Sequence, residues 1–249
     1  MTDLILLAAG QGTRLASAAG SVPKALVPTP DGGSLLEKNL RNARRSGSVR
    51  RVVVVTGYCA ESIEEEIARV AGDGAVEARH NPEFEAHGPI WSIWAARDVV
   101  LSSDVMIGNG DTYYRPEAFR EVAACRAEGG FCLGFSRRAV EADDVRVSLG
   151  PDGTVASVGK SLPDERTDGV SAGLFLARGE PARARLGALL AEFVEREGAS
   201  GRRAIWHDLV NELAATTGSL GACEIAETWW HEIDTPEDYA ALAELLGDR

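Results

Sequence analysis

The clearest indication of this chain's architecture is the stretch LAAGQGTRL (Leu7 to Leu15), followed shortly by PKAL (Pro23 to Leu26). An apolar run at 4–7 leads into it and predicts a short buried strand. The small residues after this strand let the backbone approach an anionic ligand closely, with N–H groups turned toward it. Arg14 and Lys24 then bring two positive charges to the same place. Together these features predict a binding site for a nucleoside triphosphate.

The glycine spacing separates this stretch from two common phosphate-binding loops. It does not follow G-x-x-x-x-G-K-[ST], and Leu15 stands where G-x-G-x-x-G needs its third glycine. The whole string, with PKAL downstream, instead resembles the signature of nucleotidyltransferases with a GT-A-like α/β fold, which join a nucleoside triphosphate to a phosphate-bearing acceptor. The resemblance implies phosphate contacts from Arg14 and Lys24, and nucleotide contacts from Leu7, Ala8, Ala9, Gly10 and Gly12.

Length and charge narrow the classes of function. A chain of 249 residues predicts one domain (1–249), divided here into a nucleotide-binding half (1–135) and an acceptor-binding half (136–249). Hydrophobic residues make up 45% of the chain, which is enough for a sizeable core. A formal net charge of −12 argues against nucleic acid and anionic membranes as partners. An acidic protein that binds an anionic ligand must gather its positive charge locally and use a cation such as Mg²⁺.

The cysteines and the N-terminus bear on the cellular compartment. None of Cys59, Cys125, Cys132 and Cys223 belongs to a C-x-x-C pair, so we expect small core residues rather than metal ligands or disulfides. The N-terminal apolar stretch is too short for a signal peptide and has no basic segment before it. No run approaches the length that spans a membrane. We therefore expect a soluble cytoplasmic enzyme, and the sequence leaves a homo-oligomer open.

Apolar runs alternate with amphipathic segments along the chain. In the first half this order predicts right-handed crossovers and a mostly parallel sheet, and a hairpin around Pro-Asp-Gly opens the second half. We therefore expect a three-layer α/β/α, Rossmann-like (GT-A-like) fold with a mixed, mostly parallel central sheet. The expected strands are 4–7, 51–56, 76–80, 105–108, 131–135, 145–149, 155–159, 170–177, 220–225 and 229–233; the expected helices are 34–46, 61–71, 89–99, 115–128, 181–197, 207–216 and 236–246.

Asp111 is the first candidate metal ligand. It ends the sequence IGNGD, which directly follows the expected strand 105–108. Ligands of an open α/β sheet bind beyond the carboxyl ends of its parallel strands, which is also where the N-terminal glycine stretch lies. An aspartate at this position also suits a turn, or a cap for the helix expected near Arg115. Both interpretations of Asp111 stay open at this point.

Asp234 is the second candidate. Strand alternation puts Trp230, Glu232 and Asp234 on one face of the expected strand 229–233 and its continuation. Asp234 or Thr235 also suits the N-cap of the helix entered at Pro236, and the two roles are compatible. If Asp111 and Asp234 meet, they form a hard oxygen site of the kind that holds Mg²⁺ with substrate phosphates. Zinc is not expected, because the four histidines show no paired spacing with cysteine.

These residues predict nucleotidyl transfer. A phosphate-type oxygen of the acceptor attacks the α-phosphorus of the triphosphate and expels pyrophosphate. Mg²⁺ screens the phosphates and acts as a Lewis acid, while Arg14 and Lys24 stabilise the developing charge. Lys160, directly after the expected hairpin, is a candidate for holding the acceptor's phosphate, although a loop lysine of this kind is also commonly just solvated.

Two further stretches sharpen the resemblance. The segment 81–94 is more similar to the corresponding part of phosphocholine cytidylyltransferases than to the L-G-T-A-G segment of sugar-1-phosphate members, although Gly88-Pro89 departs from the paired asparagines of the phosphocholine enzymes. The stretch 230–240 carries the same subgroup's aromatic-Glu-Ile-Asp pattern. Related cytidylyltransferases act on 2-aminoethylphosphonate and 2-hydroxyethylphosphonate. The resemblance implies Mg²⁺ ligation by Asp111 and Asp234, and acceptor-phosphate binding by Lys160, as in the sugar members.

The tryptophans bear on the acceptor. Trp91 and Trp94, or Trp229 and Trp230, could form a cage for an ammonium group. The first pair is three residues apart on an expected helix, a spacing that suits core packing equally well. The candidate acceptor-binding residues are thus Lys160, Trp91, Trp230 and Glu232.

The sequence therefore predicts a Mg²⁺-dependent cytidylyltransferase that moves CMP from CTP to a small phosphate or phosphonate monoester. The nearest alternative is a sugar-1-phosphate nucleotidyltransferase using UTP, dTTP or GTP. A third, from another class, is a catalytically silent nucleotide-sensing domain. The joint presence of Arg14, Lys24, Asp111 and Asp234 favours an enzyme over the silent domain.

Overall fold

The computed structural model describes residues 1–11, 22–72, 75–201 and 203–247. Its first half alternates strands and helices, as expected. The strands are β1 (Thr2–Ala8), β2 (Val49–Thr56), β3 (Val76–His80) and β4 (Val105–Asn109), and all their mutual pairings are parallel. The helices between them are α2 (Leu35–Arg45), α3 (Ala60–Val70), α4 (Ile90–Ala95) and α5 (Arg97–Ser102), with the short 3₁₀ turn η1 (Lys24–Leu26) before α2.

The second half turns the parallel sheet into a mixed one. Its central strand β9 (Gly169–Ala177) pairs antiparallel with β4 and with β6 (Phe131–Ser136), and the sheet runs in the order β10-β6-β9-β4-β1-β2-β3. The other second-half elements are β7 (Arg146–Leu149), β8 (Val155–Gly159), β10 (Gly221–Glu224), β11 (Trp230–Glu232), α7 (Glu180–Ser200), α8 (Trp206–Thr217), α9 (Pro236–Gly247) and the 3₁₀ turns η2 (Asp164–Arg166) and η3 (Glu227–Trp229).

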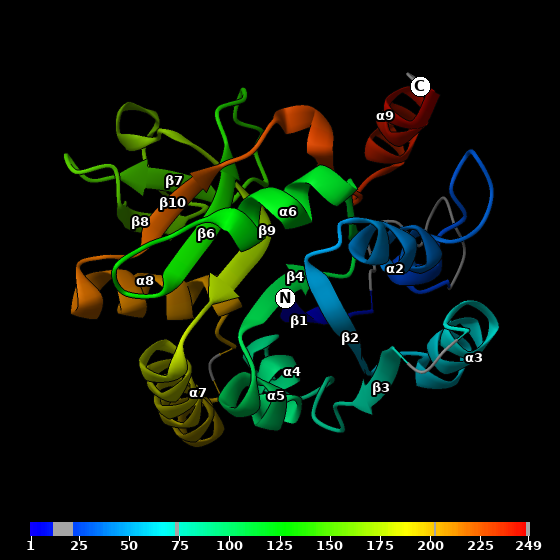
Figure 1. The fold of residues 1–249 in the computed structure, drawn as a ribbon, viewed down its shortest axis with the longest axis horizontal. Helices are drawn as coiled ribbons and strands as arrows, with labels where there is room; N and C mark the ends of the chain where they lie inside the picture. The colour runs from blue at the N-terminus through cyan, green and yellow to red at the C-terminus, as the bar shows by residue number, and fades with distance from the viewer. Residues whose placement is uncertain (12–21, 73–74, 202, 248–249) are drawn as a thin grey trace.

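Helices cover both faces of this sheet, which confirms the three-layer arrangement (Figure 1). Alternation along β1 sends Leu4 and Leu6 into one core cluster, with residues of α2, α3 and α6 (Pro116–Ala124). Ile5 points the other way, into a cluster with residues of α4, α5, α7 and α8. The strands β1, β2 and β4 are largely buried on both faces, and this is why their central residues form continuous apolar runs, whereas the edge strand β3 (VEARH) is only partly buried.

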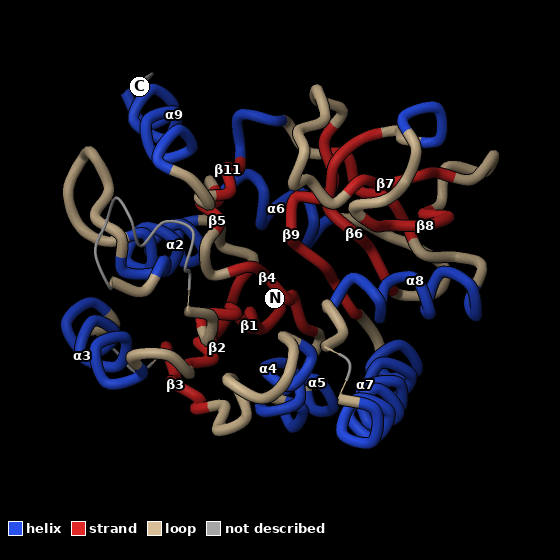
Figure 2. The backbone as a smooth tube through the Cα atoms, turned by 180° about the vertical axis from the view of Figure 1, so that it is seen from behind, coloured by secondary structure: helices blue, strands red, loops and turns tan. Residues whose placement is uncertain are grey.

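Three local features differ from the sequence-based expectation. The helix expected at 89–99 is broken at Ala96, giving α4 and α5. The expected helix 115–128 ends at Ala124. A strand that was not expected, β5 (Thr112–Tyr114), pairs antiparallel with β11 in a small second sheet. In Figure 2 this pair lies between α2 and α9, and a third apolar cluster there includes Leu35 of α2 and Leu242 of α9.

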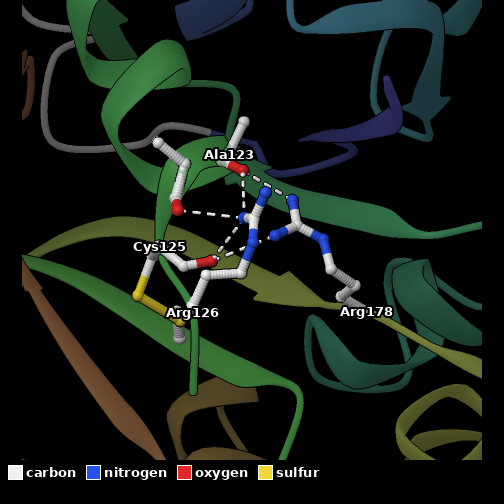
Figure 3. The surroundings of a disulfide bond; sticks show 6 residues. Ala123, Cys125, Arg126 and Arg178 are labelled. Carbon is white, nitrogen blue, oxygen red and sulfur yellow. Dashed lines mark hydrogen bonds between the residues drawn. A yellow bond between two sulfur atoms is a disulfide. The ribbon is translucent and has the colours of Figure 1, made fainter.

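The expectation that the cysteines are reduced core residues holds for Cys223 only, because Cys125 and Cys132 form a disulfide and Cys59 is exposed. The early end of α6 brings Cys125 beside the start of β6, with the two Cα atoms 6.6 Å apart. Figure 3 shows the guanidinium groups of Arg126 and Arg178 converging on the carbonyl oxygens of Ala123 and Cys125. These contacts satisfy carbonyls that the helix end leaves without backbone partners. Within the described residues, no helix has both the length and the apolar character needed to cross a lipid bilayer.

Candidate active site

The site begins where β1 and β4 end side by side. The N–H of Gly110 donates to the carbonyl of Leu7 at 2.8 Å. A Cβ atom at residue 110 would collide with that same carbonyl, so only glycine fits there. This close approach puts Asp111, the next residue, directly beside the strand end that carries Ala8, Ala9 and Gly10.

Two buried asparagines of α2 hold the backbone that follows Asp111. Asn39 donates to the carbonyl of Thr112 (2.7 Å) and accepts from the N–H of Tyr114 (3.0 Å). Asn42 donates to the carbonyl of Tyr114 at 2.8 Å. Because α2 is fixed by its apolar face, it acts as a rigid support for β5 and hence for the position of Asp111.

The antiparallel pairing of β11 with β5 delivers the C-terminal carboxylates to the same place. Glu232 lies opposite Thr112, and the N–H of Ile233 donates to the carbonyl of Asp111 at 2.9 Å. Alternation then sends Ile233 into the apolar cluster beside α9 and turns Glu232 and Asp234 toward Asp111, as expected. Thr235 accepts from the N–H of residue 238 at 3.2 Å, so the start of α9 is capped by threonine.

Three carboxylates and one lysine therefore converge. Single oxygen atoms of Asp111, Glu232 and Asp234 lie within 4.8 Å of one another. The ammonium of Lys24, from η1, lies 3.2 Å from Oδ2 of Asp111 and forms an ion pair with Oδ1 of Asp234. Residues from both ends of the chain meet here because β1, β4 and β11 end, and β5 begins, at this place.

Burial and neighbouring charges shift the pKa values of this cluster. Burial alone would lower the pKa of Lys24, but the attraction of Asp111 and Asp234 outweighs it and raises the pKa above its usual value. Burial raises the pKa of Glu232 to about 8, with a further contribution from the negative charges of Asp111 and Asp234. Lys24 and Lys160 oppose that rise only in part.

The donor set fits a hard divalent cation. Carboxylate oxygens are the ligands that Mg²⁺ takes in proteins, together with water and substrate phosphates. A cation bound beside Glu232 would oppose the rise in its pKa and favour its charged form. Asp111 and Asp234, with Glu232 as a third oxygen donor, are the residues that would hold such an ion. Sequence reasoning had placed Glu232 with the acceptor, on the same face as Asp234.

The carboxylates and Lys24 line a cavity of about 100 Å³. Lys160, which follows β8, lies on its wall, and its role in binding the acceptor stays a prediction. Sequence reasoning missed the six other lining residues, namely Asn109, Asp143, Val145, Ser171, Gly173 and His207. Asn109 could have been found from its place at the end of a parallel strand, but no local pattern marks Ser171 or His207.

The remaining sequence-predicted residues are placed as follows. Leu7, Ala8, Ala9 and Gly10 form the end of β1 and the turn after it, next to the cavity-lining strand β4. Gly12 and Arg14 lie outside the described residues. Trp91 stacks on His87, with ring centroids 4.2 Å apart, and does not line the cavity.

A second cavity, of about 360 Å³, shares Asp143, Glu232 and Asp234 with the first. Trp230 contributes to its lining, with its indole N–H bonded to Ser136 at 2.7 Å and its ring facing the guanidinium of Arg138. The wall is strongly acidic: its carboxylates are Glu141, Asp143, Asp144, Glu227, Glu232, Asp234, Asp238 and Glu244.

Comparison with known proteins adds to this geometry. A model of the MobA-like NTP transferase domain matches residues 4–211. A bifunctional IPC transferase and DIPP synthase from Rubrobacter xylanophilus is 34% identical over 97% of this chain, which spans about half (51%) of that relative. A 2-aminoethylphosphonate cytidylyltransferase from Lancefieldella rimae is 27% identical over 91% of this chain and 87% of its own length.

Among solved structures, the inositol-1-phosphate CTP transferase from T. maritima shares the fold with a TM-score of 0.79. It is 21% identical, and the alignment covers 100% of this chain and 97% of that one. This likeness confirms the expected α/β architecture with its mixed, mostly parallel sheet.

Proposed function

This chain belongs to the family of MobA-like NTP transferase domains, and we propose that it transfers CMP from CTP to a small phosphate or phosphonate monoester, releasing pyrophosphate. The observation that carries the proposal is the convergence of Lys24, Asp111 and Asp234, from distant parts of the chain, on one cavity with Lys160 on its wall. We propose a single domain in which 1–135 binds the nucleotide and 136–249 supplies most of the acceptor side.

CTP is the proposed donor because relatives named for CTP or cytidylyl transfer are found by both sequence and structure. The end of β1, with Leu7, Ala8, Ala9 and Gly10, offers backbone N–H groups for the nucleotide, and Gly12 and Arg14 complete this loop in the proposal.

The acidic and basic residues of the cavity have different roles in the proposed reaction. Asp111 and Asp234, supported by Glu232, hold Mg²⁺, which supplies Lewis-acid polarisation of the α-phosphate when bound. Lys24 stands beside them, and its ammonium stabilises negative charge that builds on the phosphate oxygens. The acceptor oxygen forms a new bond to the α-phosphorus as the bond to pyrophosphate breaks. Because the acceptor oxygen is already anionic, this step needs no strong general base.

The second cavity is the proposed place for the organic part of the acceptor. Its many carboxylates favour an ammonium-bearing acceptor, such as 2-aminoethylphosphonate or phosphocholine, with Trp230 and Glu232 at its edge. Trp91, which lies outside both cavity linings, has no part in this arrangement. A polyol phosphate is the second candidate, because a structural neighbour is named for inositol-1-phosphate and carboxylates also accept hydrogen bonds from hydroxyl groups.

Pyrophosphate release tests the proposal. The protein is assayed with Mg²⁺ and each of CTP, UTP, dTTP and GTP, against phosphocholine, 2-aminoethylphosphonate, 2-hydroxyethylphosphonate, inositol-1-phosphate and hexose-1-phosphates. We expect turnover with CTP and an acceptor that is not a hexose phosphate. Turnover only with hexose-1-phosphates would replace the proposal by sugar nucleotidyl transfer, and no turnover with any pair would favour a silent nucleotide-binding domain.

A further inference from the structure

The wall of the first cavity differs in chemistry from the carboxylate cluster that it adjoins. Asn109, Lys160 and Ser171 reach the cavity from β4, from the end of β8 and from β9, and Asp143 and Val145 also line it. An amide, an ammonium and a hydroxyl group all offer hydrogen-bond donors. One small cavity thus has carboxylates on one side, which can bind a cation, and hydrogen-bond donors from Asn109, Lys160 and Ser171, which can bind an anion beside it.

The side chain of Asn109 is oriented by two neighbours. Its Oδ1 accepts a hydrogen bond of 3.0 Å from the indole N–H of Trp206, a buried residue at the start of α8. With the oxygen bound there, the NH₂ end of the amide lies against Gly173. Gly173 has a φ of +65°, and a Cβ atom at that position would collide with Nδ2 of Asn109. A glycine is therefore needed to leave room for this amide at the cavity.

The hydroxyl group of Ser171 is held by backbone and imidazole. Oγ accepts from the N–H of Gly173 at 3.2 Å and lies 3.0 Å from Nε2 of His207. The pairing of β6 and β9 shifts register between Gly134 and Phe135, opposite this stretch of β9. When Nε2 of His207 carries hydrogen and donates to Oγ, the hydroxyl proton is free to turn toward an anion in the cavity.

The surroundings of His207 favour its neutral form. It is buried and stacks on Trp206 with ring centroids 3.9 Å apart. Burial, with the nearby charge of Lys160, lowers its pKa to about 3. The imidazole thus serves as a fixed hydrogen-bonding partner of Ser171, and the positive charge beside them comes from Lys160.

We propose that Asn109 and Ser171, together with Lys160, form the seat for the phosphoryl or phosphonyl group of the acceptor, and that Trp206 and His207 are positioning residues for this seat. The inference rests on the proposed function, since it concerns the acceptor of that same reaction. It assigns Asn109 and Ser171 as binding groups and explains why two buried aromatic residues at the start of α8 point polar atoms at the reaction centre.

The size of the cavity favours the phosphoryl group over the organic part. A volume of about 100 Å³ lies well below the range of about 300–1,000 Å³ that is typical of sites for whole organic ligands. The adjoining acidic cavity, at about 360 Å³, has room for the remainder of the acceptor but repels an anion. The anionic end therefore lies among Asn109, Ser171 and Lys160, within reach of the carboxylate cluster.

Steady-state kinetics with the acceptor that gives the highest rate test the seat. For Ser171→Ala we expect the acceptor KM to rise at least 10-fold, with the KM for CTP changed less than 2-fold. Asn109→Asp keeps an oxygen for Trp206 but replaces the NH₂ group by negative charge, so the acceptor KM should rise at least 30-fold. Ser157→Ala is the matched control, because Oγ of Ser157 is buried without a hydrogen-bond partner and does not line the cavity.

The positioning role of His207 is tested by a double-mutant comparison. His207→Leu should raise the acceptor KM in the wild-type background. In the Ser171→Ala background it should change the acceptor KM less than 2-fold further, because the two residues act through one hydroxyl group. Melting temperatures measured alongside separate this effect from loss of fold.

The possible results separate the seat from the proposed function. Pyrophosphate release with unchanged acceptor KM in Ser171→Ala and Asn109→Asp would overturn the seat alone. A larger rise in the KM for CTP than for the acceptor would assign this wall to the nucleotide and also overturn it. No release by the wild-type protein with any acceptor would overturn the proposed function and the seat together.

Discussion

The Nζ atom of Lys24 lies 3.2 Å from Oδ2 of Asp111, although 87 residues separate the two along the chain. The lysine comes from the turn η1, and the aspartate follows a central strand of the parallel sheet. The same ammonium also pairs with Asp234, from the far C-terminal part of the chain. This one lysine thus links the N-terminal segment to both candidate metal ligands.

Asp111→Asn should abolish most activity while leaving the fold intact. The amide keeps the shape of the side chain but removes the charge that would hold the cation, so we expect kcat to fall at least ~100-fold, equivalent to about 3 kcal/mol. Asp98→Asn, which alters a surface ion pair with Arg79, should retain wild-type kcat. Initial rates and circular dichroism check both variants, and full activity of Asp111→Asn at ordinary Mg²⁺ would refute its role.

Asn39→Ala should lower both stability and turnover. It removes the partner of two buried backbone groups in β5, at Thr112 and Tyr114, so we expect a loss of about 2–4 kcal/mol in the free energy of unfolding. Lys38→Ala, on the same helix, breaks only a partly exposed ion pair with Asp31 and should cost less than about 1 kcal/mol. Urea denaturation measures both, and equal losses would show that Asn39 does not support β5.

His207 should make the fold less stable in mild acid. Its pKa is lowered to about 3 in the native state from an ordinary 6.5, so between these values the unfolded chain binds a proton that the native chain does not. The contribution of the neutral His207 to the free energy of unfolding is therefore fully present above pH 6.5 and is lost as the pH falls below it. We expect protonation of this residue in the unfolded chain to lower the free energy of unfolding by about 2 kcal/mol at pH 5 relative to pH 7.5.

The pH effect is isolated by comparison with His207→Gln, which cannot titrate. Urea denaturation at pH 7.5 and pH 5 should show a smaller loss of stability in this variant than in the wild-type protein. An identical pH dependence in the two proteins would mean that the imidazole is protonated in the native state.

Reduction of the disulfide between Cys125 and Cys132 should weaken the fold modestly. Closing so short a loop stabilises a protein by about 2–3 kcal/mol through the entropy of the unfolded chain. Thermal melting with and without a reductant measures this, and Cys125→Ala should reproduce the reduced value without responding to reductant. A reductant effect that persists in Cys125→Ala would exclude this bond as the cause.

The sequence predicted those parts of the fold that depend on residues close together along the chain. Continuous β-branched runs mark the buried parallel strands, and Ser34 caps α2 by accepting the N–H of Glu37 at 3.0 Å. The position of Asp111 also followed from a local rule, because residues after parallel strands gather at one edge of the sheet. Asp234 reaches the same place through the antiparallel pairing of β11 with β5, which lies outside that rule.

The missed features depend on tertiary contacts. The strand β5 has three residues, too few for any periodicity to show, and its pairing with the expected strand β11 depends on a contact between distant parts of the chain. Ser171 reaches the cavity where the pairing of β9 with β6 shifts register, and no sequence pattern reports such a shift. The disulfide needed α6 to end early, where the neighbouring Arg126 and the distant Arg178 cap its last carbonyl groups.

The central claim is that Asp111 and Asp234 hold one divalent ion beside the bound nucleotide, and Mn²⁺ titration followed by electron paramagnetic resonance tests it most directly. With CTP present, we predict a signal from protein-bound Mn²⁺ in the wild-type protein. The affinity for Mn²⁺ should fall at least 10-fold in both Asp111→Asn and Asp234→Asn. Equal Mn²⁺ affinity in the wild-type protein and both variants would contradict the claim.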